Sequence, residues 1–347
     1  MAVGRTVADV RRALRRPVTP VAAPARSVGV DAVRVLGLLA VVAGHVYDRE
    51  VRLLLYPWHV PVFFVISGYL WSPGRTLAAE TQRRVRSLVL PYLTWLAVIA
   101  TMLIAWHLAV GRSPAWLPPA LAWGGARLGQ PFSAFWFVTA LLVACLLYRL
   151  AERVPWRWRG LAVGAALSAA YAVGPALKNV PLSAGVAVAC VAFVFAGDAL
   201  RRYRARIAAP LLVGGLLVAG GALVFTTGLS SSLNLKGAGF GTPYLGFAGA
   251  AAISAGLVLL GEALAAHLPG PVRDAIVQLA SVGLVVVLTH SAVLWALREY
   301  DVPNLAFALA TILPWLAGLL LARTRLAVLT VGSGPALVRL RRPARPL

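Results

Sequence analysis

The sequence predicts an all-α integral membrane protein with about ten transmembrane helices and both termini in the cytoplasm. Three observations predict this fold. Hydrophobic residues make up 60% of the 347 positions and charged residues only 13%, whereas a soluble domain carries about a quarter charged residues. Apolar segments of roughly 20 residues, enough to cross the bilayer, recur along the chain. Arginine-rich blocks separate these segments on alternating sides, as the positive-inside rule requires.

Ten apolar segments are candidates for the membrane helices. They lie at about 29–47, 53–71, 88–110, 134–150, 160–175, 183–200, 207–228, 243–266, 275–297 and 304–322. A backbone in lipid must satisfy its hydrogen bonds within the segment, which favours helices over strands. The segment at 160–175 is short and rich in small residues. We therefore expect a transmembrane domain at 28–323, between basic cytoplasmic tails at 1–27 and 324–347, the first of them disordered.

The basic residues support this topology. If the N-terminus is inside, the inside segments hold 25 of the 33 Lys and Arg residues, the outside segments hold seven, and Arg34 lies within a span. The formal net charge of +22 is thus explained by membrane orientation, and we expect no nucleic-acid partner. We expect a multi-pass protein of a bacterial inner (plasma) membrane, with the lipid bilayer as its main surroundings.

Cysteine and glycine predict packing rather than chemistry. Cys145 and Cys190 both lie in apolar segments, as small buried hydrophobes do. No cluster of ligands has metal spacing, so we expect no metal and no permanently bound cofactor. The pairs Gly214–Gly215 and Gly220–Gly221 favour close helix contact, either inside the protein or in a homodimer.

The first apolar segment carries three ionisable residues, which are costly within a membrane and therefore functional candidates. Arg34 and His45 are 11 residues apart, about three helical turns, so they share a helix face and are separated by ~16 Å. Asp31 lies one turn before Arg34 and can form an ion pair with it. The alternative is that Arg34 and His45 merely extend to the two membrane interfaces.

Other polar residues lie in or near later segments. In the second segment, His59 lies near the same end as His45, and Ser67 is followed by Gly68, a pair that favours close helix packing. Before the third segment, Arg83 and Arg86 are one turn apart; they are either a topogenic block or a phosphate-binding pair. His290 lies well inside the ninth segment and should face a polar interior.

Taken together, these residues resemble the acyltransferase 3 family of membrane-bound acyltransferases. The similar elements occur in the family's order from about residue 29 to 322: Asp31, Arg34 and His45; His59 with Pro61, Phe63, Phe64, Ser67, Gly68 and Tyr69; Arg83 and Arg86; Leu90, Pro91 and Tyr92; Phe135, Trp136 and Phe137; Phe195 and Gly197; Ser281, Gly283 and His290. One departure is that Val35 and Leu36 stand before Gly37, whereas the family often has Gly directly after the arginine.

The resemblance implies transfer of an acyl group, usually acetyl, from acyl-CoA to a hydroxyl of a glycan, a lipid-linked sugar or a natural product. It implies that His45 acts as a general base or forms an acyl-histidine, with Arg34 and Asp31 in the catalytic set. Arg34, Arg83 and Arg86 would bind acyl-CoA. The residues expected around the acceptor are His59, Ser67, Tyr69, Trp136 and His290.

Two other functions stay open at this point. In a multi-pass transporter or flippase, the buried Arg and His would line a translocation path. In a catalytically silent partner, the same residues would only support assembly with other membrane enzymes. Loss of activity on His45→Ala, in a protein that still folds, would distinguish an enzyme from both.

Overall fold

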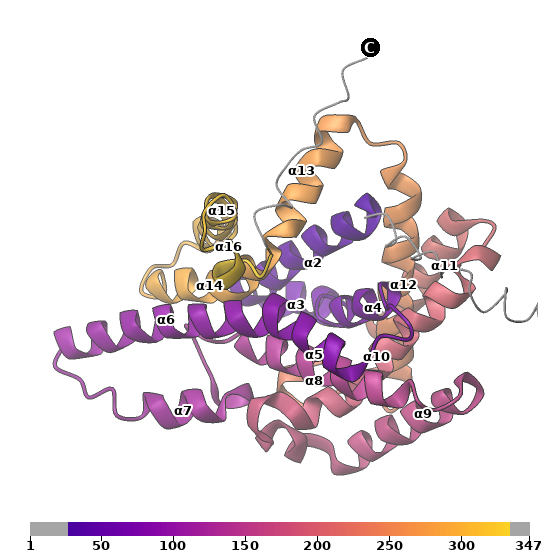
Figure 1. Cartoon of the computed structure of the whole chain (residues 1–347), viewed down its shortest axis with the longest axis horizontal. Coiled ribbons are helices and arrows are strands. Elements are labelled where there is room, and N and C mark those ends of the chain that lie inside the picture. The colour runs from indigo at the N-terminus through magenta and orange to yellow at the C-terminus, as the bar shows by residue number, and fades with distance from the viewer. Residues whose placement is uncertain (1–26, 334–347) are drawn as a thin grey trace, which may run out of the picture.

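The computed structural model describes residues 27–333, and every regular element in this part of the chain is a helix. The prediction of an all-α fold is confirmed. Nearly all of the predicted tail at 1–27, and residues 334–347 of the second tail, lie outside the described residues. Figure 1 shows α2 (Val28–Val46) in the middle of the molecule, where it packs against α12 (Leu245–Ala265), α13 (Gly270–Ser281), α14 (Gly283–Ala296) and α15 (Pro303–Leu321).

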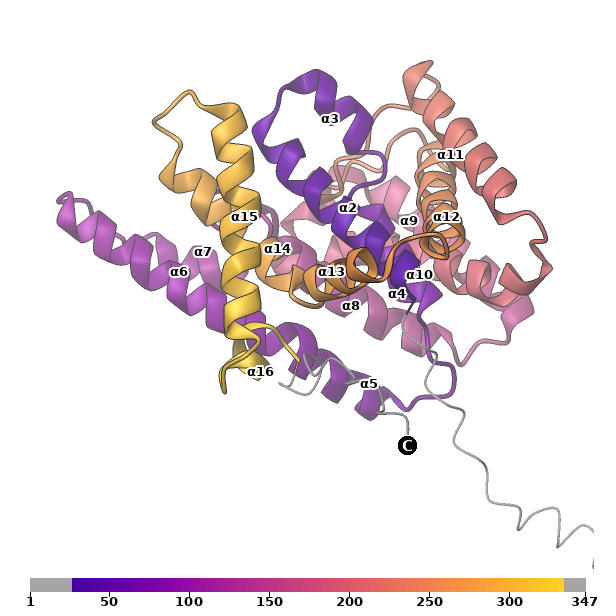
Figure 2. The same cartoon turned by 90° about the horizontal axis from the view of Figure 1, so that it is seen from above.

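The remaining α-helices surround this centre. They are α3 (Arg49–Leu55), α4 (Pro61–Tyr69), α5 (Leu77–Arg84), α6 (Leu90–Ala109), α7 (Leu117–Trp123), α8 (Phe135–Ala151), α9 (Trp156–Val173), α10 (Ala184–Tyr203), α11 (Pro210–Thr226) and α16 (Ala327–Thr330). Seen from above, α6 extends on one side and α11 and α12 lie on the other, with α2 and α4 between them (Figure 2).

Six helices of the described residues are long and apolar enough to cross a membrane, or seven if the bent pair α13 and α14 forms one span. The two helices of this pair meet at 65°. Two further apolar helices, α8 and α11, have 17 residues each. A multi-pass membrane protein is therefore supported, while ten crossings and cytoplasmic termini stay predictions.

The predicted helix at 53–71 is wrong as a single element. The chain instead forms α3, turns over residues 56–60, and starts again as α4 at Pro61. Proline favours the first turn of a helix, where its missing N–H costs no hydrogen bond. With nine residues, α4 is about 14 Å long and cannot cross ~30 Å of hydrocarbon alone.

Glycines set the closest helix crossings. A Cβ on Gly68 of α4 would lie 1.9 Å from the carbonyl oxygen of Val194, and one on Gly197 of α10 would lie 1.9 Å from that of Val65. The two backbones therefore touch, as the sequence Ser67–Gly68 predicted. Both cysteines are free and buried within the same core.

The paired glycines of α11 divide between two roles. Gly214 and Gly221 face α12, where an added Cβ would meet the carbonyl oxygens of Gly256 and Gly249 at 3.0 and 2.6 Å. Gly215 and Gly220 have nothing within 4 Å of an added Cβ. Internal packing thus uses one member of each pair, and a homodimer stays a prediction.

Candidate active site

Two cavities lie on opposite sides of one apolar wall. The first, which we call the histidine cavity, is lined by His45, His59 and Trp136 and holds about 100 Å³. The second, the arginine cavity, is lined by Arg34 and Arg83 and holds about 300 Å³. Three residues border both cavities and form the wall between them: Phe63, Phe137 and Val287. The rings of Phe63 and Phe137 meet edge to face with centroids 5.5 Å apart.

The shared helix face predicted for Arg34 and His45 leads to these two cavities. Both residues lie on α2. His45 borders the histidine cavity, and Arg34 borders the arginine cavity. The expected ion pair is confirmed, because Arg34 Nη1 donates to Asp31 Oδ1 at 2.8 Å. Asp31 is fully buried, whereas the Arg34 side chain is 34% exposed. One helix thus presents a tethered guanidinium on one side and an imidazole on the other.

His45 has a second imidazole beside it. The ring of His290, from α14, lies with its centroid 5.2 Å from that of His45. His290 is fully buried, and its Nδ1 lies 2.8 Å from the carbonyl oxygen of Val286. Because a carbonyl only accepts, Nδ1 carries the proton and Nε2 is the free acceptor. That Nε2 is buried and has no hydrogen-bond partner in the described part of the chain.

The break between α3 and α4 positions His59. This residue lies in the turn, where its Nδ1 is 2.9 Å from the carbonyl oxygen of Leu55 and its ring centroid is 4.8 Å from that of Tyr56. The same argument protonates Nδ1 and leaves Nε2 as an acceptor. His59 and Tyr56 both line the histidine cavity. A continuous helix over 53–71 would have placed His59 differently.

Lys236 is a residue of the histidine cavity that the sequence did not point to. It lies in η6 (Leu235–Gly237), and its Nζ donates to the carbonyl oxygens of Leu128 at 2.5 Å and Ser133 at 3.2 Å. Burial lowers the pKa of this ammonium group to about 8. Its sequence signal is weak, because a lysine in a polar loop is ordinarily solvated.

In the arginine cavity, the structure places Arg84 where Arg86 was expected. Arg83, Arg84 and Ser67 line the cavity, whereas Arg86 is exposed and is not among the lining residues. The reason is a π-helical turn, η1 (Val85–Val89), between α5 and α6. Its wider i→i+5 turn changes the side on which each residue emerges, so Arg83 and Arg86 no longer share a face.

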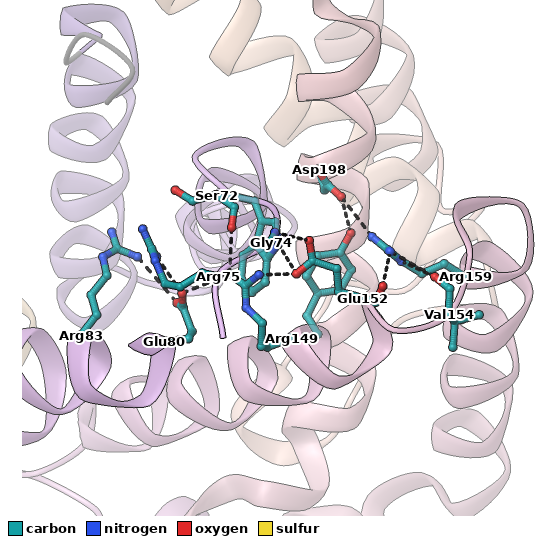
Figure 3. Close-up of polar contacts among 12 residues, drawn as sticks. Ser72, Gly74, Arg75, Glu80, Arg83, Arg149, Glu152, Val154, Arg159 and Asp198 are labelled. Carbon is teal, nitrogen blue, oxygen red and sulfur yellow. Dashed lines mark hydrogen bonds and ion pairs between the residues drawn. The ribbon is translucent and has the colours of Figure 1, made fainter. Parts of the chain in front are cut away.

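Buried Glu80 holds the arginines of this region. It is fully buried and accepts from Arg75 at 2.8 Å, Arg84 at 2.7 Å and Arg149 at 3.1 Å, with Arg83 at 3.6 Å. Figure 3 shows Arg149 between Glu80 and Glu152, and beyond it the Arg159–Asp198 pair at 3.7 Å. The signal that sequence reasoning missed is that Glu80 precedes Arg83 and Arg84 by three and four residues.

The remaining candidates separate into those at a cavity and those elsewhere. Ser67 borders the arginine cavity and Trp136 the histidine cavity. Tyr69 lines neither of them: its hydroxyl donates to Glu262 at 2.8 Å, and Glu262 also accepts from Arg204 at 2.8 Å. Tyr69 therefore ties α4 to α12. No group of three or more His, Cys, Asp or Glu residues between 27 and 333 can hold a metal ion.

The C-terminal part of the described chain closes the arginine cavity. Val331, Gly332 and Ser333 line it, and Trp95 of α6 donates to the carbonyl oxygen of Thr330 at 3.0 Å. Residues 327–333 therefore belong to the folded body, although the sequence placed them in a cytoplasmic tail. Their position makes the arginine cavity a partly enclosed site.

The arrangement can perform chemistry across a barrier. One side of the wall offers imidazoles, which in their neutral form can accept a proton from a hydroxyl. The other side offers guanidiniums, which bind phosphate groups. Comparison with known proteins gives one result of the same kind: the family model for an acyltransferase domain, of the acyltransferase 3 type, matches residues 27–324. Neither the curated proteins nor the solved structures gave a match.

Proposed function

This chain belongs to the acyltransferase 3 family, and we propose that it transfers an acyl group, specifically acetyl, from acyl-CoA to an acceptor hydroxyl. The acceptor class is a glycan, a lipid-linked sugar or a natural product. The observation that carries the proposal is the wall of Phe63, Phe137 and Val287, which has His45 on one side and Arg34 and Arg83 on the other. Membership of the family favours an acyltransferase over a transporter.

The donor is assigned to the arginine cavity. Acyl-CoA carries several phosphate groups, and guanidiniums bind such groups through paired hydrogen bonds. Arg83 and Arg84 border the cavity from α5, and Arg34 borders it from α2. Arg84 is held by Glu80, while the Arg83 side chain is 53% exposed and available to a ligand. The thioester end would point toward the wall and His45.

The acceptor hydroxyl is assigned to the histidine cavity. In the proposed step, His45 takes the proton of the hydroxyl, whose oxygen attacks the thioester carbonyl carbon. The carbon–sulfur bond then breaks, and the CoA thiolate leaves and receives the proton. His290 would act as a positioning residue, because its free Nε2 can accept the N–H of His45 and keep the other His45 nitrogen unprotonated.

The experiment that tests the donor site needs no known acceptor. The melting temperature of the purified protein is measured with and without acetyl-CoA, for wild type, Arg83→Gln and Arg86→Gln. A ligand that binds only the folded state raises the melting temperature. We expect stabilisation in wild type, its loss in Arg83→Gln and its retention in Arg86→Gln.

Arg86→Gln is a matched control, because it removes the same charge from the same segment at an exposed position outside the cavity. Stabilisation by longer acyl-CoAs alone would change the acyl group of the proposal. Absence of stabilisation by any acyl-CoA, in folded wild-type protein, would contradict acyl-CoA as the donor. The acceptor is sought in a separate assay, which measures acyl transfer to components of an extract of bacterial lipids and polysaccharides. We expect this transfer to be absent in His45→Ala.

A further inference from the structure

A third cavity adjoins the histidine cavity and is bordered by positive charge. It holds about 340 Å³ and is lined by Arg127, Lys178, Asn179, Asn234 and Lys236, together with two small residues. Asn234 and Lys236 also line the histidine cavity. We call this third space the cationic vestibule. The vestibule therefore adjoins the cavity that His45 lines, and the side chains of Asn234 and Lys236 lie at the junction.

Three separate segments bring one cation each to the vestibule. Arg127 comes from η2 (Gly125–Arg127), Lys178 from η3 (Gly174–Asn179) and Lys236 from η6. All three segments contact one another. Lys178 and Lys236 are the only two lysines in the sequence, which otherwise uses arginine. The tertiary structure thus gathers cations that lie far apart along the chain.

These cations have no acidic partners among the described residues. Between residues 27 and 333, no carboxylate forms an ion pair with Arg127, Lys178 or Lys236. Arg127 stacks over Trp123 at 3.9 Å, which fixes its plane and leaves its charge uncompensated. By contrast, the buried arginines Arg84 and Arg149 are paired with Glu80, and buried Arg159 is paired with Asp198. An uncompensated cluster in a cavity attracts anions.

The ammonium group of Lys236 is positioned rather than free. Two of its three N–H donors bind the carbonyl oxygens of Leu128 and Ser133. Within the described chain, the third donor remains for a ligand. Ser133 continues the connection, since its hydroxyl lies 2.7 Å from that of Ser291, the residue after His290. Ser133 therefore contacts Lys236 through its carbonyl oxygen and, through its hydroxyl, the residue next to His290.

A second opening beside His45 lacks this character. It holds about 220 Å³ and is bordered by Gln130, Arg298 and Asp301. Arg298 forms an ion pair with Glu299 at 3.2 Å, and Asp301 adds a negative charge. Of this opening and the cationic vestibule, the vestibule is the one whose lining suits an anion.

We propose that the cationic vestibule binds a phosphate-type oxyanion carried by the acceptor, and so presents a neighbouring sugar hydroxyl to His45. This inference rests on the proposed function, and it narrows the acceptor to a phosphorylated sugar or a sugar linked to lipid through phosphate. Three cations and two amide side chains match the charge and the acceptor oxygens of such a group. The vestibule then acts as the specificity site and His45 as the base.

The probes are glucose 1-phosphate and glucose, which differ by the phosphate alone. Melting temperature is measured in phosphatidylcholine nanodiscs at constant ionic strength, for wild type, Arg127→Gln/Lys178→Gln, and Arg49→Gln/Arg112→Gln. The last variant removes two other basic residues, which lie outside the vestibule. We expect glucose 1-phosphate to raise the melting temperature of wild type and of Arg49→Gln/Arg112→Gln. We expect no rise with glucose, and none with either probe in Arg127→Gln/Lys178→Gln.

Several results would overturn the proposal. Equal stabilisation by glucose and glucose 1-phosphate is one, and stabilisation that survives in Arg127→Gln/Lys178→Gln is a second. A third is loss of the glucose 1-phosphate effect when phosphatidylglycerol replaces phosphatidylcholine, since the site would then take a lipid headgroup. Arg83→Gln separates this site from the donor site, because it should keep the glucose 1-phosphate effect. If acetyl-CoA stabilises the protein and glucose 1-phosphate does not, the vestibule proposal fails and the proposed acyl transfer stands.

Discussion

The imidazole rings of His45 and His290 lie with centroids 5.2 Å apart, although they come from α2 and α14 near opposite ends of the chain. The Nδ1 of His290 contacts the carbonyl oxygen of Val286, which fixes the ring. Its Nε2 is buried and has no hydrogen-bond partner among the described residues. A pair of this kind can hold one imidazole in the tautomer that a general base requires.

The histidine pair predicts unequal effects of substitution. His45→Ala should lower acyl transfer by about 10²–10⁴-fold, the usual contribution of a general base. His290→Gln should lower kcat by about tenfold, or ~1.4 kcal/mol, with little change in KM for the acceptor. Rates of label transfer from radiolabelled acetyl-CoA measure both. The double variant should be no slower than His45→Ala alone, because the two residues act as a unit. A rise in KM with unchanged kcat in His290→Gln would contradict a positioning role.

The shared wall predicts that binding and transfer can be separated. Val287→Phe adds volume between the two cavities and should block the thioester from His45. We expect label transfer to fall more than 10-fold, about 1.4 kcal/mol or more in the barrier. Stabilisation by acetyl-CoA should remain, because the arginines are untouched. Val98→Phe, on an exposed part of α6, is the control for added bulk. Loss of acetyl-CoA stabilisation together with transfer would place the donor elsewhere.

Glu80 predicts a large effect on stability. Its carboxylate is fully buried among Arg75, Arg83, Arg84 and Arg149. Among the described residues, Glu80→Gln would leave Arg75, Arg83 and Arg84 without a carboxylate partner and Arg149 with Glu152 alone. Removing one partner of a buried ion pair costs about 3–5 kcal/mol. We expect a lower melting temperature and a weaker response to acetyl-CoA. Glu299→Gln, at a side chain that is 73% exposed, should change neither. Equal melting temperatures for the two variants would show that Glu80 is not a structural centre.

The crossing of α4 and α10 predicts a strong dependence on glycine. A methyl group at Gly68 would lie 1.9 Å from a carbonyl oxygen of the opposing helix, so the helices must separate. Overpacking of this kind costs about 1–3 kcal/mol or more. Gly68→Ala should lower the melting temperature in detergent, while Gly215→Ala, which meets open space, should not. Phe63 lies in α4 and His59 lies in the turn just before it. A shift of α4 in Gly68→Ala should therefore lower activity even where the protein remains folded.

Lys236 predicts a pH dependence for anion binding. Burial lowers its pKa to about 8, so the ammonium is charged below this pH and neutral above it. The vestibule should therefore bind glucose 1-phosphate best below pH 8 and lose affinity as the pH rises through 8. The phosphate does not titrate in this range, since its second pKa is about 6. Lys236→Arg should keep binding up to pH 9, because a guanidinium remains charged. An identical pH profile in both proteins would contradict the role of Lys236.

The same pKa has a consequence for folding. Between pH 8 and the ordinary lysine pKa of about 10.4, the unfolded chain binds a proton that the folded chain does not. The contribution of Lys236 to the free energy of unfolding therefore rises with pH across this window. Burial of its charged ammonium group destabilises the folded state most below pH 8. This direction is opposite to that of anion binding, so the two effects can be told apart by measuring melting temperature with and without glucose 1-phosphate.

The sequence by itself determined the membrane class, the all-α fold and the family. These follow from apolar length, from arginine blocks and from motifs in register, and such properties are local along the chain. The ion pair of Asp31 and Arg34 was predictable for the same reason, since three residues of helix bring the two side chains together. The close approach of another helix at Gly68 could be predicted in the same way, because small residues favour helix contact.

Only the tertiary structure decided which residues meet across the fold. The helix break before Pro61 places His59 at the histidine cavity. The π-helical turn at Val85–Val89 leaves Arg84, rather than Arg86, at the arginine cavity. The hydrophobic periodicity of the sequence predicts neither the helix break nor the π-helical turn, because each depends on how the ends of the helices pack. The contact of His45 with His290, and the gathering of Arg127, Lys178 and Lys236, join segments that are distant in sequence. Such contacts depend on the packing of the whole chain, which local pattern and spacing do not specify.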